Sequence, residues 1–137
     1  MVDSQKACSL ITQYYFLLKT PLFFCVINLT EDLALKQAKR ADSLLKNGII
    51  LGPLHGIPYG LKDLISVEGY PTTWGAYPYK NQRINKTATI ARELERSGAV
   101  LVAKLVSGSL ARGDVWFGGM TRNPWDPKQG ASGSSAG

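Results

Sequence analysis

The residues of this chain best suited to chemistry are one lysine and a pair of serines. Lys62 stands in a run from His55 to Ile65, and Ser134 and Ser135 lie in a glycine-rich segment at residues 130–137. A serine hydroxyl becomes a good nucleophile only when a base removes its proton. A neutral lysine can be that base, and burial favours the neutral form. For a lysine taken by itself, the ordinary interpretation is a strand-end side chain that reaches solvent or pairs with the adjacent carboxylate.

Two other catalytic patterns fit the glycine- and serine-rich segment less well. Residues 133–137 match the G-x-S-x-G nucleophile elbow with Ser135 as nucleophile, but the elbow needs a buried strand before it and a histidine after it. Residues 123–130 are polar and contain two prolines, and the single histidine, His55, lies upstream, where we interpret it as a turn residue. A phosphate-binding loop would end in Gly-Lys-Ser or Gly-Lys-Thr, which is absent. By composition alone, the segment is typical of a flexible linker.

The composition indicates a folded domain without an obvious charged partner. Hydrophobic residues make up 45% of the 137, which is enough for a packed core. The net charge of +6 is spread along the chain, and its densest cluster is Lys36, Lys39 and Arg40. We interpret that cluster as the solvated face of a helix and expect no direct DNA binding.

The cysteines and the N-terminal residues add little about function. Cys8 and Cys25 match no metal or redox spacing, and without a disulfide framework they favour a reducing compartment, cytoplasmic or organellar. We therefore expect no metal and no organic cofactor. Residues 10–29 are rich in apolar side chains, but Lys19 and Pro21 interrupt them before the roughly 18 residues of a membrane span. A targeting segment is disfavoured because no clear cleavage site follows.

The first element that the pattern predicts is a helix over residues 30–47. Thr30 can cap its start, and two acidic residues follow in the first turn. Gly48 can provide the left-handed stop. Helical spacing gives one apolar face, made of Ala34, Ala38, Ala41 and Leu45.

Lys62 belongs to a predicted strand within residues 55–65. Alternation places Ile57, Tyr59 and Leu61 on one face. The opposite face carries only small or ring residues besides the lysine, which predicts space beside Lys62. Those residues are Gly56, Pro58 and Gly60.

A helix and a strand are predicted downstream. Asn85 or Thr87 can cap a helix that runs through Ser97, with Ile90 and Leu94 facing inward and Gly98 ending it. Residues 100–103 are all apolar and predict a short buried strand. The order strand, helix, strand predicts a parallel pair in an α/β sheet with a right-handed crossover.

Several segments, in order, resemble the amidase signature family. Residues 52–64 resemble the segment that presents the family's catalytic lysine, and residues 123–127 with 133–137 resemble the start of its glycine- and serine-rich signature. Residues 87–104 and 26–38 resemble further parts of the family. The likeness covers residues 26–137 and leaves 1–25 as an unmatched N-terminal segment. It implies an incomplete amidase domain with the α/β amidase-signature fold, in which helices flank a mixed central sheet truncated within the sheet.

The resemblance also implies a mechanism. The family uses a lysine, a serine that follows a cis peptide bond, and a nucleophilic serine; the first two correspond to Lys62 as base and Ser134 as relay. A cis bond before a residue other than proline costs about 2.5–4 kcal/mol, so the surrounding fold must enforce it. The nucleophile would lie beyond Gly137 in a Gly-Gly-Ser context. We therefore expect the 137 residues alone to be inactive, and the full-length protein to hydrolyse a small-molecule amide.

Two alternatives remain open. Ser107 and Ser109 follow Lys104 where many relatives have Thr or Asn and an acidic residue, which leaves the substrate undetermined. The parent could be the A-type component of a glutamyl-tRNA amidotransferase, which uses glutamine as ammonia donor and works with partner subunits and tRNA. The chain could instead be a non-catalytic binding fragment whose uncovered sheet edges meet a partner.

Overall fold

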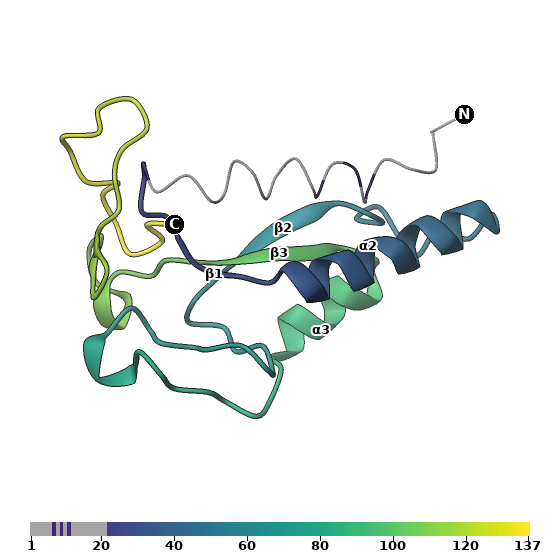
Figure 1. The fold of residues 1–137 in the computed structure, drawn as a ribbon, viewed down its shortest axis with the longest axis horizontal. Helices are drawn as coiled ribbons and strands as arrows, with labels where there is room; N and C mark the ends of the chain where they lie inside the picture. The colour runs from purple at the N-terminus through teal and green to yellow at the C-terminus, as the bar shows by residue number, and fades with distance from the viewer. Residues whose placement is uncertain (1–6, 8, 10, 12–21) are drawn as a thin grey trace.

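The core of the fold is a three-stranded mixed sheet with two helices. The computed structural model describes residues 7, 9, 11 and 22–137. Strand β3 (Val100–Leu105) lies in the centre, antiparallel to β1 (Val26–Leu29) and parallel to β2 (Pro58–Lys62). The helices α2 (Glu31–Lys46) and α3 (Thr89–Arg96) pack beside the sheet (Figure 1). The predicted α/β class and the parallel strand–helix–strand unit are confirmed.

The remaining elements are short and gather at one end of the sheet. They are the 3₁₀ helices η1 (Tyr77–Tyr79) and η2 (Ser109–Ala111) and the hairpin strands β4 (Val115–Trp116) and β5 (Gly119–Met120). In Figure 1 these segments lie beyond the ends of β2 and β3, near the C-terminus. The loops that follow both parallel strands therefore meet on the same side of the molecule.

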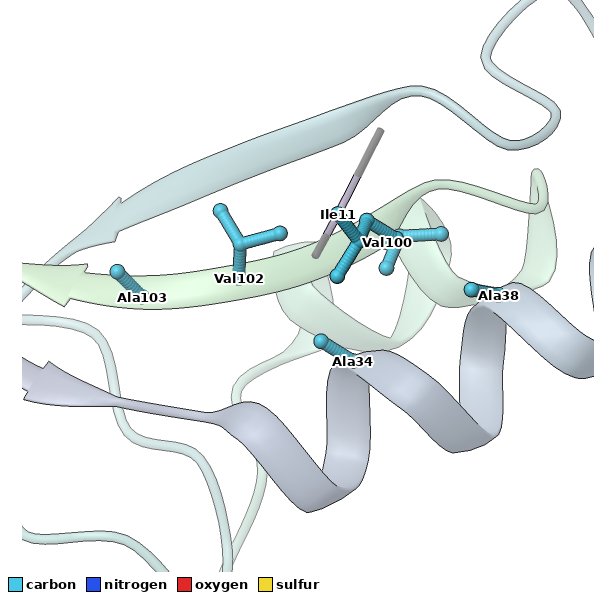
Figure 2. Close-up of a cluster of buried hydrophobic side chains, with 6 residues drawn as sticks. All are labelled: Ile11, Ala34, Ala38, Val100, Val102 and Ala103. Atoms are coloured by element: carbon cyan, nitrogen blue, oxygen red, sulfur yellow. The ribbon is translucent and has the colours of Figure 1, made fainter. Parts of the chain in front are cut away.

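Two apolar clusters use alternate residues of β3. Val100 and Val102 pack against Ala34 and Ala38 of α2, together with Ile11 (Figure 2). Leu101, between them, packs in a second cluster whose other buried members are Leu61, Val67 and Ala91. Because successive strand residues point to opposite faces, the central strand is covered on both sides.

The helix predicted at residues 30–47 is confirmed as α2, with one correction at its start. Ala34, Ala38 and Ala41 are buried, and Gly48 follows the helix with φ of 74°. Thr30 does not cap the helix with its side chain. Its buried hydroxyl donates instead to the carbonyl of Leu101, at 2.7 Å, because the helix begins directly beside β3.

The second predicted helix is shorter than expected. It starts at Thr89, and Ala88 at its N-cap position provides no side-chain cap, so neither Asn85 nor Thr87 has the predicted role. Ala91 is the buried residue, whereas Ile90 is 52% exposed and was wrongly predicted to face inward. Eight residues make only about two turns, so the helix buries a narrow stripe. The predicted stop at Gly98, with φ of 86°, is confirmed.

The strand that carries Lys62 is confirmed as β2, with two corrections. Tyr59 and Leu61 lie in the second cluster as predicted, but Ile57 precedes the strand and is 49% exposed. The space expected beside Lys62 is filled: a Cβ on Gly60 would lie 2.5 Å from the side chain of Leu105. Leu105 is the residue of β3 that pairs with Lys62 in the register.

The N-terminal predictions fall largely on residues that the structure does not describe. Cys8 and most of the apolar segment at 10–29 are among them. Across the described residues, no helix has the length and apolar character to cross a membrane. Cys25 is a half-buried free thiol, and burial raises its pKa. Lys36, Lys39 and Arg40 are exposed, in agreement with a solvated helix face.

The second cluster predicts how the chain responds to alkali. Burial, and then the negative charge of Glu95, raise the pKa of Tyr59 to about 12 from 10.0. The folded state therefore favours the neutral phenol, so its contribution to stability is complete below pH 10 and disappears as the pH rises toward 12. We expect Tyr59→Phe to remove a tyrosinate absorbance transition centred near pH 12. Tyr77→Phe, which removes an exposed phenol, is the control, and a lost transition centred near pH 10 in Tyr59→Phe would contradict the expectation.

Candidate active site

The structure brings Lys62 together with the two serines. Lys62 is the last residue of β2, and its Nζ donates to Ser134 Oγ and to Ser135 Oγ, both at 3.1 Å. Ser134 lies 72 residues further along the chain. Lys62 and Ser134 are half-buried, and Ser135 is exposed. A base and two hydroxyl groups therefore share one site at the end of a parallel strand.

Backbone hydrogen bonds hold the serine segment against the residues that follow β3. The amide of Gly108 donates to the carbonyl of Ser134 at 3.3 Å, and the amide of Gly137 donates to the carbonyl of Val106 at 3.1 Å. Ala136, between them, is buried. The linker interpretation of this segment is therefore wrong in this structure, because its backbone groups are paired with the sheet's extension.

The start of the serine segment is held by the β4–β5 region. Ser132 has φ of 57°, an uncommon left-handed conformation for a residue other than glycine. Its amide donates to Asp114 Oδ2 at 3.0 Å. The carbonyl of Asp114 accepts from the amide of Thr121 at 3.1 Å, and the amide of Ala131 donates to the carbonyl of Thr121 at 2.8 Å. Asp114 and Thr121 thus fix the turn that presents Ser134 and Ser135.

A buried ion pair lies directly behind Lys62. Lys104 Nζ is 2.6 Å from Asp63 Oδ1, and both side chains are 0% exposed. The same Nζ donates to the carbonyl of Pro71 at 3.1 Å and to Thr72 Oγ1 at 3.4 Å. Desolvation lowers the pKa of Lys104, and the hydrogen bond and charge of Asp63 oppose that effect.

The carboxylate of Asp63 is also hydrogen-bonded on its other oxygen. Asp63 Oδ2 accepts from the amide of Thr73 at 2.8 Å and from Thr73 Oγ1 at 2.5 Å. Asp63 therefore forms its ion pair with Lys104, and the expected alternative, a Lys62–Asp63 pair, is not formed. Lys62 remains directed at neutral hydroxyl groups.

Sequence reasoning missed this ion pair although a signal was present. Lys104 stands inside the apolar run at residues 100–106, which predicts a strand covered on both faces. A charged residue inside such a strand must find a counter-charge, because an unpaired buried charge costs several kcal/mol. That argument demands an acidic partner but does not say that the partner is Asp63.

The remaining candidate residues lie apart from the site or differ from expectation. His55 accepts from the amide of Leu51 at Nδ1 and contacts the carbonyl of Ala41 through Nε2 at 3.0 Å, as a satisfied turn residue would. Ser107 is buried and donates to the carbonyl of Gly108. No strand directly precedes Ser135, as an elbow would require. Among the described residues, no group of three His, Cys, Asp or Glu side chains could hold a metal ion.

The cis peptide bond implied at Ser134 does not occur in this structure. Every peptide bond of the described residues is trans. A cis bond to a residue other than proline requires surrounding packing that compensates its cost. Here Gly133 and Ser135, on either side of Ser134, are exposed, so packing of that kind is not in place.

Comparison with known proteins agrees with the motifs. A family profile described as Amidase matches residues 18–137. The A-type component of the glutamyl-tRNA(Gln) amidotransferase of Chloroflexus aurantiacus is 40% identical over 120 residues, which cover 85% of this chain and 25% of the relative. That of Legionella pneumophila is 38% identical over 115 residues, covering 81% and 23%. The solved peptide amidase of Stenotrophomonas maltophilia superposes with a TM-score of 0.81 at 33% identity, covering 98% of this chain and 29% of that structure.

The buried ion pair predicts a specific pattern of stabilities. Removing one partner leaves the other charge buried without compensation, which costs about 3–5 kcal/mol, whereas removing both costs far less. We expect Asp63→Asn and Lys104→Met each to lower the free energy of unfolding by that amount, and the double variant to recover most of the loss. Urea unfolding followed by circular dichroism measures all three.

An exposed ion pair gives the matched control. Arg96 and Glu93 are 2.6 Å apart, but their side chains are 71% and 53% exposed. We expect Arg96→Gln to change the free energy of unfolding by less than about 1 kcal/mol. Single variants of the buried pair that behave like Arg96→Gln would show that the pair is not closed to water.

Proposed function

The chain belongs to the amidase family, and on this basis we propose that it forms part of an enzyme that hydrolyses a carbon–nitrogen amide bond through an acyl-serine intermediate. It spans about a quarter of the length of the curated relatives that it matches. The activity proposed is therefore that of a longer protein, to which these residues contribute the base and a relay.

The contact between Lys62 and Ser134 carries the proposal. Their Nζ and Oγ atoms are 3.1 Å apart although 72 residues separate them in the sequence. That distance allows direct proton transfer between the two groups. Both residues come from the segments that match the family's lysine and serine motifs, which supports the same two roles.

In the proposed mechanism a proton moves along the line from a nucleophilic serine through Ser134 to Lys62. The neutral amine of Lys62 accepts the proton of the Ser134 hydroxyl, while Ser134 accepts the proton of the nucleophile. The nucleophile's oxygen forms a bond to the carbonyl carbon of the amide. The proton then returns by the same route to the leaving nitrogen as the carbon–nitrogen bond breaks. Water hydrolyses the remaining ester in a second pass of the same steps.

The nucleophile is the part of this mechanism that the 137 residues do not supply. By the family resemblance it follows Ser134 in a Gly-Gly-Ser context, beyond Gly137. Ser135 also contacts Lys62, but it is exposed and stands in the pair that the resemblance assigns to the relay. We therefore propose that residues 1–137 alone hydrolyse no amide.

Kinetics of the full-length product of the native transcript test the two roles. We expect Lys62→Ala and Ser134→Ala each to lower kcat/KM for amide hydrolysis by roughly 10²–10⁴, as loss of a general base does. Lys39→Ala, which removes an exposed lysine of α2, should leave kcat/KM unchanged. Full activity in Lys62→Ala would refute the role of base, and rapid turnover by residues 1–137 alone would refute the proposed inactivity.

A second candidate is favoured by the names of the curated relatives. The relatives from Chloroflexus aurantiacus and Legionella pneumophila are both named as the A-type component of a glutamyl-tRNA(Gln) amidotransferase. We propose as the alternative that the parent protein is such a component, so that the ammonia released from glutamine is passed on rather than lost to water. It would then work with partner subunits and with tRNA.

Purification of the endogenous protein separates the two candidates. If the parent is an amidotransferase component, another polypeptide should copurify with it at a constant ratio. Hydrolysis of simple amides by the protein acting alone would instead favour the first candidate. A transcript that stops directly after the codon for Gly137 would argue against both, and would favour a non-catalytic binding fragment.

A further inference from the structure

Asp63, the residue directly after Lys62, uses every one of its polar groups inside the protein. Its amide donates to the carbonyl of Leu105 at 2.8 Å, and its carbonyl accepts from the amide of Trp74 at 3.3 Å. Its two carboxylate oxygens accept from Lys104 and Thr73. Asp63 thereby joins the end of β2 to β3 and to the loop at residues 71–74.

These contacts leave the backbone at Lys62 little freedom. The carbonyl of Lys62 accepts from the amide of Ile65 at 3.0 Å, which closes a tight turn immediately after the strand. On the strand side, Lys62 is paired with Leu105 in the register. The Cα of Lys62 is therefore fixed from both directions. A fixed root matters for this residue, because a long flexible side chain loses conformational entropy when it is held in one place.

The ion pair also decides what Lys62 contacts. A carboxylate next to a lysine in the sequence is a natural partner for it, and here that carboxylate is occupied by three donors from Lys104 and Thr73. Lys62 donates instead to Ser134 and Ser135. Stability alone is a weak reason for such a pair, because well-packed apolar residues in its place are often as stable or more stable.

We propose that Asp63 and Lys104 are positioning residues for Lys62: their buried ion pair fixes the turn after β2 and withholds the carboxylate, so that the Lys62 amine points at Ser134 and Ser135. This inference rests on the proposed role of Lys62 as base. Neither Asp63 nor Lys104 takes part in the chemistry, and each acts only through the geometry of Lys62.

The test is a double-mutant cycle read by the reactivity of one amine in the 137-residue chain. Trace acetylation with an N-hydroxysuccinimide ester, followed by digestion and mass spectrometry, gives the labelling ratio of Lys62 to the exposed Lys39. Replacing both acceptors (Ser134→Ala with Ser135→Ala) frees the Lys62 amine, so the ratio should rise roughly threefold, in line with the small net gain from part-exposed hydrogen bonds. The same serine replacement is then made in the charge-free background Asp63→Asn with Lys104→Met.

Coupling between the two pairs of substitutions decides the outcome. If the ion pair positions Lys62, the serine replacement should have no further effect in the charge-free background, because the amine is already released. An equal rise in both backgrounds would show that the ion pair serves the fold alone and would overturn the proposal. No rise in the unaltered chain would overturn it as well, since Lys62 would then not be held by the serines.

Two further variants guard against trivial results. Thr30→Val removes another buried hydrogen bond to β3, the one to Leu101 at 2.7 Å, at a point remote from Lys62 along the strand. It should leave the threefold serine effect intact, and a loss of that effect would attribute the coupling to general loosening of the sheet. If the charge-free variant does not fold, Thr73→Val takes its place, because it removes only one donor to Asp63 Oδ2. A reduced serine effect in Thr73→Val supports the proposal, and a full effect overturns it.

The labelling ratio is independent of turnover. If the full-length protein proves to have no amidase activity while the cycle shows coupling, the proposed function fails and the positioning of Lys62 stands. If activity is found without coupling, the positioning proposal fails and the proposed function stands.

Discussion

The ion pair between Lys104 and Asp63 is the interaction on which the rest of this structure depends. Lys104 lies in the middle of a strand covered on both faces, where a charge without a partner would prevent the strand from being buried. Pairing with Asp63 allows β3 to occupy the centre of the sheet and brings the end of β2 beside it. Both apolar clusters use side chains of β3, so their packing requires that the charge of Lys104 first be compensated.

The site forms where the two parallel strands end. Lys62 closes β2, and the residues that follow β3, from Val106 to Gly108, pair with the backbone of the serine segment. Parallel strands place their carboxyl ends at one edge of the sheet, and in open α/β sheets ligands bind outside that edge. The sheet thus gathers segments from three distant parts of the chain, and the hydrogen bonds of Asp114 aim the last of them at Lys62.

The sequence predicted the elements better than it predicted their contacts. Periodicity found α2, β2 and β3, because each buries one regular set of side chains, such as Ala34, Ala38 and Ala41. The family motifs named Lys62 and Ser134, which the structure places in contact. Thr30, Ile90 and the space beside Gly60 were wrongly predicted, because each depends on what lies across the sheet rather than along the chain. The partner of Lys104 could not be read for the same reason, since 41 residues separate it from Asp63.

That separation sets an order of events during synthesis. At about 5–20 residues per second, a ribosome takes roughly 2–8 s to proceed from Asp63 to Lys104. Throughout that interval the carboxylate has no counter-ion to enter the core with, so it stays hydrated and keeps the end of β2 open to water. The emerging chain can form α2 on its own, but β2 has no neighbour to join until β3 is complete. The sheet therefore closes in one late step, and the charge that makes the pair stable also sets the earliest moment at which the nascent protein can fold.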